Sequence, residues 1–202
     1  RKGADKGQID FVTEVASLVP MNNICDMVGI PEEHRRTVAY ESQFADGWRD
    51  PRLLQGAEPL ARLAQTILPV HGIAHELIGQ RRSKPENDLM TALVQAEVDG
   101  ERFTDDDISS IFALLIIAGN DTTRYSIAAG IQALCHQPEL LAQLQSGAVW
   151  DTMPDEVIRW ATPALYFRRT AARDFEFHGR QVKAGQKVLY WFASGNRDEA
   201  AF

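Results

Sequence analysis

The chain has few of the features that are typical of secreted, membrane-spanning or metal-stabilised proteins. It contains only two cysteines, Cys25 and Cys135, which lie far apart and outside any metal-ligand spacing, so neither a disulfide framework nor a cysteine metal site is predicted. We expect both to be small buried side chains. No run of 18 apolar residues occurs and no signal-peptide pattern opens the sequence, so we expect no membrane span and a reducing, cytoplasmic setting.

Basic residues are also in the minority. Lysine and arginine number 21 against 28 acidic residues, for a net charge of −7, which argues against general binding to the phosphate backbone of nucleic acids. A hydrophobic content of 45% and a charged content of 24% are ordinary for a soluble globular protein. A length of 202 residues is enough for one large or two small domains.

The spacing of apolar residues predicts a mainly helical chain whose last third turns to short strands. A break is expected near Pro20, a loop around 50–56 and a polar linker over 83–87, whereas the helix that contains Pro69 is expected to continue through it. The strands are expected over 175–177, at Val182 and over 187–192. The helices are expected over about 10–27, 31–48, 58–82, 88–98, 104–136, 138–147 and 154–161.

The helix over 104–136 carries an unusual polar insertion. Thr104 and Asp107 form the pattern of a capping box at its start, and at 1.5 Å per residue the helix would be roughly 50 Å long. Near its middle, a nine-residue apolar run ends in Ala118-Gly119-Asn120-Asp121-Thr122-Thr123. A buried unpaired carboxylate costs several kcal/mol, and a mid-helix glycine costs about 1 kcal/mol relative to alanine. The insertion therefore indicates a notch for a ligand beside a proton-handling pair.

This hexapeptide resembles the distal I-helix motif of the cytochrome P-450 haem-thiolate monooxygenases. Three further segments resemble motifs of the family in the family's order: Glu156 to Arg159 its K-helix Glu-x-x-Arg, Arg169 to Ala171 its Arg-x-Ala, and Asn196 to Asp198, with Phe202 behind them, the opening of its meander. The resemblance covers essentially all of residues 1–202, from about the D or E helix to the start of the meander.

The resemblance implies a mainly α, partial cytochrome P-450 fold with a long central I helix and a small β region at its C-terminal end. The helices over 31–48 and 58–82 would be the F and G helices, which form a mobile lid. The family's Phe-x-x-Gly-x-x-x-Cys-x-Gly loop, whose cysteine binds the iron, is not in the sequence. We therefore expect an internal fragment that is inactive by itself, and we assign no metal ligand.

The activity that the resemblance implies is insertion of one oxygen atom of dioxygen into a C–H bond of an apolar substrate. It implies a haem b cofactor, with electrons from NAD(P)H delivered through a ferredoxin or flavodoxin and its reductase. The segments 118–124 and 194–199 look most similar to bacterial members that act on steroids, terpenes or branched lipids. Two alternatives stay open: a truncated, non-catalytic relative that binds an apolar ligand without haem, and a helical interaction module.

The same resemblance gives roles to residues of the central helix. Asp121 and Thr122 would be the catalytic acid and alcohol that deliver protons during oxygen activation, since a hydroxyl both donates and accepts while a carboxylate relays protons. Ala118 and Gly119 would let haem and substrate approach the helix. The structural alternative is a threonine bonded to its own i−4 carbonyl, with Asp121 paired to a nearby cation.

Further residues follow from the later motifs. Arg169 would bind a haem propionate through its planar guanidinium, unless a different register gives that role to Arg168, because only one of two adjacent strand residues points inward. Leu165, Tyr166 and Phe167, after Ala164, would line the substrate side of the haem. Ordinary core packing is the alternative for them.

Two remaining pairs are structural in our interpretation. Glu156 and Arg159 share a helix face, and the resemblance implies a buried scaffold pair, whereas the alternative is a surface ion pair of under about 1 kcal/mol. His71 and His75 have i, i+4 metal-ligand spacing, but no third ligand accompanies them. We therefore predict no metal site at these histidines.

Overall fold

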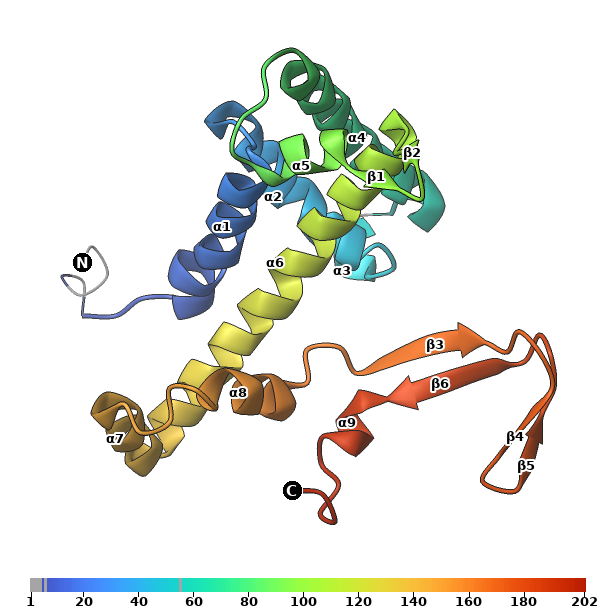
Figure 1. Ribbon diagram of the computed structural model, residues 1–202. Coiled ribbons are helices and arrows are strands. Elements are labelled where there is room, and N and C mark those ends of the chain that lie inside the picture. The colour runs from blue at the N-terminus through green and yellow to red at the C-terminus, as the bar shows by residue number, and fades with distance from the viewer. Residues whose placement is uncertain (1–4, 6, 55) are drawn as a thin grey trace. The chain divides into compact units, whose positions relative to one another are not determined.

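A computed structural model describes residues 5, 7–54 and 56–202. The chain divides into two compact units, Arg1–Arg124 and Tyr125–Phe202, with helix α6 (Asp105–His136) shared between them. Figure 1 identifies the elements of both units. The fold is mainly α with short strands, as predicted.

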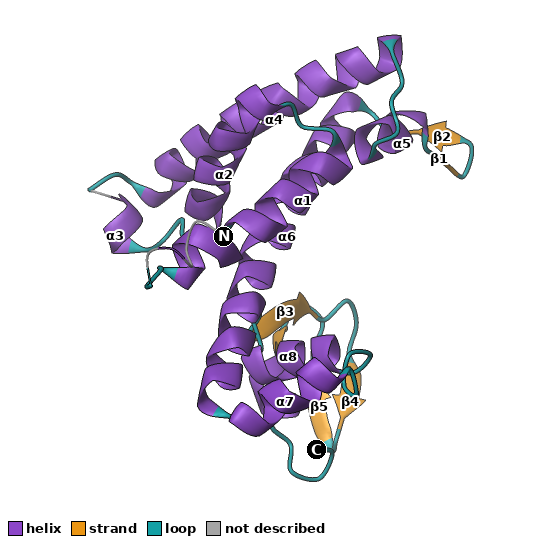
Figure 2. Ribbon diagram, turned by 90° about the vertical axis from the view of Figure 1, so that its left-hand side faces the viewer, coloured by secondary structure: helices purple, strands orange, loops and turns teal. Residues whose placement is uncertain are grey.

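The first unit is helical apart from one small hairpin (Figure 2). Its elements are the π-helix η2 (Val12–Ala16), α1 (Leu18–Val28), α2 (Glu32–Asp46), α3 (Pro51–Leu54), α4 (Pro59–Ser83), α5 (Leu89–Gln95), β1 (Glu97–Val98), β2 (Glu101–Arg102) and the first part of α6. Helix α4 packs against α2 and α5, and α1 contacts both α2 and α5. The predicted continuation of α4 through Pro69 is confirmed.

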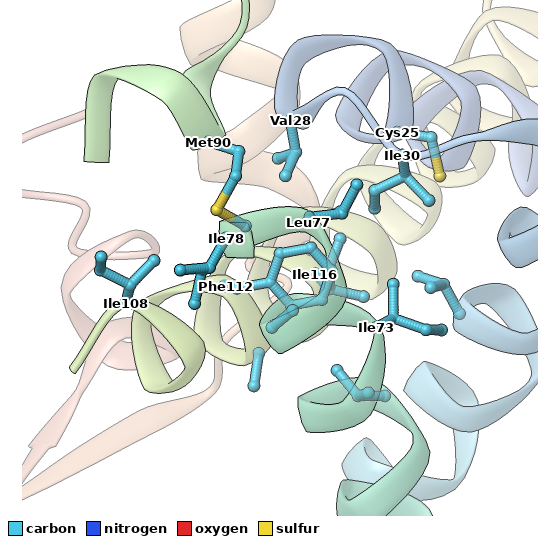
Figure 3. Close-up of a cluster of buried hydrophobic side chains, with 14 of the residues drawn as sticks. Cys25, Val28, Ile30, Ile73, Leu77, Ile78, Met90, Ile108, Phe112 and Ile116 are labelled. Carbon is cyan, nitrogen blue, oxygen red and sulfur yellow. The ribbon is translucent and has the colours of Figure 1, made fainter. Parts of the chain in front are cut away.

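The hydrophobic core of this unit gathers large aliphatic side chains from α1, α4 and α6 around Phe112 (Figure 3). Leu77, Ile78, Ile116 and Phe112 are at most 1% exposed. Burying each such side chain stabilises the fold by about 1.5–3 kcal/mol. The core therefore holds one face of α6 firmly against α4, and this contact fixes the helix that carries the polar motif.

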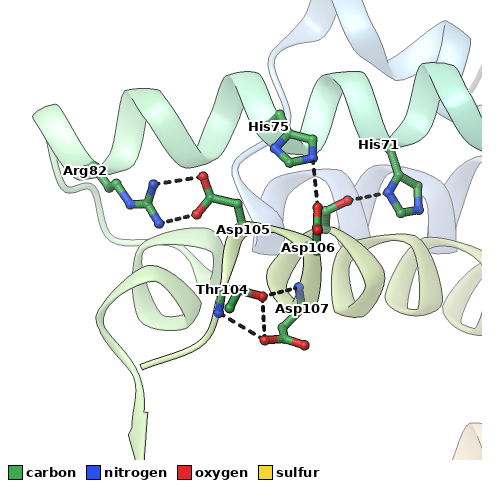
Figure 4. Close-up of polar contacts among 8 residues, drawn as sticks. His71, His75, Arg82, Thr104, Asp105, Asp106 and Asp107 are labelled. Atoms are coloured by element: carbon green, nitrogen blue, oxygen red, sulfur yellow. Dashed lines mark hydrogen bonds and ion pairs between the residues drawn. The ribbon is translucent and has the colours of Figure 1, made fainter. Parts of the chain in front are cut away.

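Polar contacts continue this packing along one side of α4 (Figure 4). Arg82 forms a bidentate ion pair with Asp105, in which one nitrogen lies 2.9 Å from the carboxylate. His75 Nε2 lies 3.9 Å from Asp106 Oδ1, and His71 Nδ1 lies 2.5 Å from the hydroxyl of Ser109. The two histidines therefore contact separate partners on α6, and the described residues contain no group of three or more His, Cys, Asp or Glu that could hold a metal ion.

The start of α6 has the capping arrangement that the sequence predicts. The Asp107 N–H donates to Thr104 Oγ1 at 3.1 Å, and the Thr104 N–H donates to Asp107 Oδ2 at 3.0 Å. The hydrogen bond from the Thr104 hydroxyl also contributes to lowering the pKa of Asp107. Because two otherwise unpaired donors are satisfied, α6 begins at a defined residue, and the position of the motif along it is set.

The second unit consists of the rest of α6, three short helices and two hairpin-like strand pairs. Strands β3 and β6 pair antiparallel, as do β4 and β5. Gly130 lies against α8, where an added Cβ would come within 3.2 Å of Val157. The further elements are α7 (Pro138–Ser146), α8 (Met153–Ala161), β3 (Tyr166–Thr170), β4 (Phe175–Phe177), β5 (Arg180–Val182), β6 (Lys187–Trp191) and α9 (Phe192–Gly195).

Two expectations about the elements were wrong. The expected break near Pro20 is not among them, because η2 ends at Ala16 and α1 begins at Leu18 with Pro20 in its first turn, where the missing N–H of proline has no intrahelical partner to lose. Pro51 begins the short helix α3 instead of lying in a loop. The helix expected over 88–98 ends at Gln95, because the backbone is already extended at Ala96. Asp99 and Gly100, which both have positive φ, join β1 to β2 in a tight hairpin.

In the part of the chain that the structure describes, no helix has the length and apolar character needed to cross a membrane.

Candidate functional site

The polar motif lies where one face of α6 is packed and the other is uncovered. Phe112 and Ile116 are fully buried, whereas Leu114 is 64% exposed and Ala118 and Thr122 are exposed as well. Leu114, Ala118 and Thr122 are spaced four residues apart and so share one side of the helix. An apolar stripe that ends in a hydroxyl therefore faces away from the core of its unit.

Glycine at position 119 is not required by the packing of this unit. An added Cβ would lie 3.8 Å from the Ile24 side chain, which is an ordinary van der Waals distance. Together with the exposed Ala118, Gly119 keeps this part of α6 narrow. A surface without side-chain bulk fits the close approach of a flat macrocycle, so the residues present fit the distal side of a haem.

Asp121 and Thr122 make local contacts. The Thr122 hydroxyl donates to the Ala118 carbonyl at 2.7 Å, and Arg124 lies 2.9 Å from Asp121 Oδ1, with the Asp121 side chain 14% exposed. The structural alternative expects these same contacts. Proton delivery by this pair is therefore still a prediction.

Asn120 is a residue of this site that the sequence interpretation missed. It is 3% exposed, and its side-chain amide donates to Ser42 Oγ of α2 at 3.2 Å and to Asp121 Oδ1 at 3.3 Å. The signal that could have identified it is its spacing from the buried residues of α6. Asn120 follows Phe112 and Ile116 at intervals of four residues, so it continues the buried stripe of α6.

Neither cysteine has the surroundings of a thiolate ligand to iron. Cys25 is fully buried, with its Sγ 3.7 Å from the Met21 sulfur, and burial raises the pKa of its thiol to about 11. Cys25 is therefore a protonated core residue. Cys135 is exposed near the end of α6, so the expectation that both cysteines are buried was wrong for Cys135.

The register of β3 decides which residues share a face with Arg169. Arg168 pairs with Leu189 and Arg169 with Val188. Directly opposed residues point to the same face, and neighbours along a strand alternate, so Arg169 shares its face with Val188 and Phe167. The Arg169 guanidinium lies 5.8 Å from the centre of the Phe167 ring, and both arginines are exposed.

The pleat of β3 also divides the predicted substrate residues. Tyr166 packs against Trp191 with ring centres 4.9 Å apart, and Phe167 meets the edge of Phe192 at 5.4 Å. Tyr166 and Phe167 lie on opposite faces of the strand, so a ligand on one face contacts only one of these side chains. Leu165, Tyr166 and Phe167 are each about half exposed, and core packing therefore does not account for them in this unit.

Glu156 and Arg159 form a bidentate pair, with nitrogen–oxygen distances of 2.7 and 2.6 Å. The Arg159 side chain is 19% exposed and the Glu156 side chain 59%, so the expected burial of the pair is wrong for the glutamate. Arg159 also donates to the Asn196 carbonyl at 2.6 Å and lies over the Phe202 ring. The hydrogen bonds from Arg159 hold the pKa of Glu156 below its usual value.

The second unit also contains a cavity of about 340 Å³ between the end of α6, α7 and α8. Leu134, Leu144, Val157 and Trp160 contribute to its lining. Of the predicted site residues only Glu156 reaches it. The candidate haem-contacting residues lie outside this cavity and form two groups: Ala118 to Thr122 in the first unit, and Leu165 to Arg169 in the second.

The chain is similar to known proteins over nearly all of its length. The sequence profile of the family described as Cytochrome P450 matches residues 10–147. A methyl-branched lipid omega-hydroxylase of Mycobacterium tuberculosis is 39% identical over 197 residues, covering 96% of this chain and 45% of the relative. A steroid C26-monooxygenase of the same species is 36% identical over 201 residues, covering all of this chain and again 45% of the relative. The chain thus spans about half the length of these curated relatives.

Solved structures give the same result. A cytochrome P450 of Mycobacterium marinum in complex with pseudoionone is 46% identical, with a TM-score of 0.89 over 96% of this chain and 47% of its own. A cytochrome P450 of Bacillus megaterium in complex with testosterone is 26% identical, with a TM-score of 0.83 over 96% of this chain and 52% of its own. With four sequence motifs, the family profile and the fold in agreement, the chain belongs to the cytochrome P450 family.

Proposed function

We propose that the complete polypeptide carrying these residues is a haem-dependent monooxygenase that inserts one oxygen atom of dioxygen into a C–H bond of an apolar substrate. The observation that carries this proposal is the uncovered face of α6, where Ala118 and Gly119 leave the helix bare beside Thr122. Haem b, when bound there, supplies the activation of dioxygen. The substrate class is a steroid, terpene or branched lipid, in line with the relatives named as a lipid hydroxylase and a steroid monooxygenase.

Asp121 and Thr122 handle protons in this proposal. The Thr122 hydroxyl lies on the same exposed face as Ala118 and holds one proton, which it donates at present to the Ala118 carbonyl. Asp121, with its side chain 14% exposed, resupplies that proton from solvent. A carboxylate that is mostly buried yet reaches water at one edge suits a relay between solvent and a closed site.

Arg169 would bind a haem propionate, and the residues before it would contact the substrate. The Arg169 guanidinium is exposed and has no carboxylate partner among the described ion pairs, so it is available to a haem propionate. Phe167 lies on the same face of β3, and it would contact substrate from there. Leu165 and Tyr166 offer further apolar surface, with Tyr166 on the opposite face.

The enzyme's electrons come from NAD(P)H through a ferredoxin or flavodoxin and its reductase, and the enzyme acts in the cytoplasm. The family as a whole uses redox partners, and the particular partner is part of this proposal. No basic surface for nucleic acid is proposed, because acidic residues outnumber basic ones.

The proposal is tested with the purified, haem-loaded complete polypeptide and a surrogate ferredoxin and reductase. Cholesterol derivatives, terpene ketones and methyl-branched fatty acids are offered with NADPH under ¹⁸O₂. The expected result is a product that carries one ¹⁸O atom and forms only with NADPH. A polypeptide that binds these compounds without taking up haem would instead support the non-catalytic alternative, in which the cavity of about 340 Å³ between α6, α7 and α8 is the place to look for the ligand.

A further inference from the structure

Asn120 occupies a position where an apolar side chain would pack more simply. It is 3% exposed and continues the stripe of Phe112 and Ile116 on α6. Its Oδ1 is buried and has no hydrogen-bond partner in the described part of the chain. A buried polar atom without a partner destabilises a fold. A gain in stability therefore does not explain why position 120 is an asparagine. Its role is better sought in the two hydrogen bonds that its amide donates.

The first hydrogen bond ties Asn120 to helix α2. Its amide donates to Ser42 Oγ at 3.2 Å, and the Ser42 hydroxyl donates its own proton to the Ala39 carbonyl at 3.1 Å. With that proton engaged, Ser42 Oγ acts as an acceptor towards Asn120. Ser42 is itself 2% exposed. The contact is therefore directional, and it depends on where α2 lies against α6.

The second hydrogen bond reaches the carboxylate of Asp121. The Asn120 amide lies 3.3 Å from Asp121 Oδ1, and Arg124 contacts the same oxygen at 2.9 Å. Arg124 is three residues further along α6, so it moves with Asp121 whatever α2 does. The hydrogen bond from Asn120 differs, because the amide that donates it is also bonded to Ser42 of α2.

We propose that Asn120 is a positioning residue that makes the orientation of the Asp121 carboxylate depend on the seating of α2. With α2 in place, both hydrogens of one amide group are used, one on Ser42 and one on Asp121. Without the hydrogen bond to Ser42, the amide has no partner outside α6, and the carboxylate loses a donor that is held in place. Proton delivery through Asp121 is then most efficient while Asn120 is bonded to Ser42 of α2. This inference rests on the proposed role of Asp121.

The test uses Asn120→Leu, Ser42→Ala and Ser42→Thr in the complete, haem-loaded enzyme. Leucine has the same number and branching of side-chain heavy atoms as asparagine but no donor, and threonine keeps the hydroxyl of Ser42. We expect Asn120→Leu and Ser42→Ala to lower kcat and the fraction of NADPH electrons recovered in product by about two- to tenfold, the effect of losing one long hydrogen bond. KM and haem content should stay unchanged, and the solvent deuterium isotope effect on kcat should rise. Ser42→Thr should behave as the parent enzyme.

A double variant separates this inference from the proposed function. If Asn120 acts through Asp121, adding Asn120→Leu to Asp121→Asn causes no further loss of coupling. Unchanged coupling in Asn120→Leu, or losses that simply multiply in the double variant, would overturn the inference. If Asp121→Asn alone leaves coupling intact, the proposed role of Asp121 fails, and the inference fails with it. Should Asn120→Leu fold poorly, the comparison of Ser42→Ala with Ser42→Thr decides, and equal coupling in these two contradicts the inference.

Discussion

The Arg81 guanidinium lies 2.6 Å from the Asp88 carboxylate, and the two side chains are only 7% and 5% exposed. Arg81 also donates to the Gly29 carbonyl at 3.1 Å, where α1 ends in a left-handed residue with φ +84°. Asp88 in turn caps α5 by accepting from the Thr91 N–H at 2.8 Å. One buried ion pair therefore joins the ends of α1 and α4 to the start of α5.

Removing the charge of Asp88 should destabilise the first unit strongly. Burial alone would raise the pKa of Asp88, but the hydrogen bonds from Thr91 and Arg81 outweigh it and lower that pKa. Asp88→Ala leaves the buried Arg81 charge with only the half-exposed carboxylate of Glu86, 3.4 Å away, and breaking a buried pair in this way costs about 3–5 kcal/mol. Urea unfolding at neutral pH measures this loss. Asp105→Ala is the matched control, because its pair with Arg82 is 41–49% exposed and should matter far less.

The same pair has a defined pH dependence. A carboxyl whose pKa is lowered by folding contributes stability above its unfolded pKa of about 4 and loses it as the pH falls through the folded value. The stability difference between the parent protein and Asp88→Asn should therefore be constant from neutral pH to about pH 5 and shrink below about pH 4. A difference that grows in acid would contradict the assigned ion pair.

Arg159 should matter more than its partner Glu156. Arg159→Ala removes the contact between α8 and the Asn196 carbonyl as well as the ion pair, whereas Glu156 is 59% exposed and water can replace its contribution. We expect Arg159→Ala to give mostly aggregate or haem-free complete protein, and Glu156→Gln to retain more haem. Expression yield and haem content per polypeptide measure this. Full haem content in Arg159→Ala would mean that the Glu-x-x-Arg motif has no scaffold role here.

Arg168 and Arg169 form a natural pair of test and control on opposite faces of β3. If Arg169 binds a propionate, Arg169→Ala should release haem to apomyoglobin several-fold faster than the parent enzyme, because a charge-assisted hydrogen bond is lost. Arg168→Ala should release haem at the parent rate. The reverse order would assign the propionate to Arg168 and shift the interpretation of β3 by one residue.

Local signals predicted most of the fold correctly. The capping box at Thr104 and the apolar stripe of α6 depend only on nearby residues, so they could be recognised without tertiary contacts. The β1–β2 hairpin was missed because the apolar spacing of 88–98 suits a helix, while the Asp99–Gly100 turn ends it. The pairing of β1 with β2 on either side of this turn replaces the last part of the predicted helix.

The candidate site was only half predictable for a different reason. Asp121 and Thr122 stand out in the sequence because they interrupt an apolar run. Asn120 was passed over, since its contact is with Ser42, which lies 78 positions earlier in the chain. The opposite facing of Tyr166 and Phe167 follows from the pairing of β3 with β6, whose register the sequence did not predict. A single sequence does not predict which distant segments of the chain come into contact.

The most direct test of the central claim compares Thr122→Ala with Thr123→Ala in the complete, haem-loaded enzyme. Both are exposed threonines on neighbouring positions of α6, so they match in chemistry and in effect on the helix. The measurement is the ratio of hydrogen peroxide to oxygenated product per NADPH consumed. We expect Thr122→Ala to keep its haem but to divert most electrons to peroxide, while Thr123→Ala should resemble the parent enzyme. Equal product coupling in the two variants would contradict the assignment of Thr122 as the proton-donating hydroxyl.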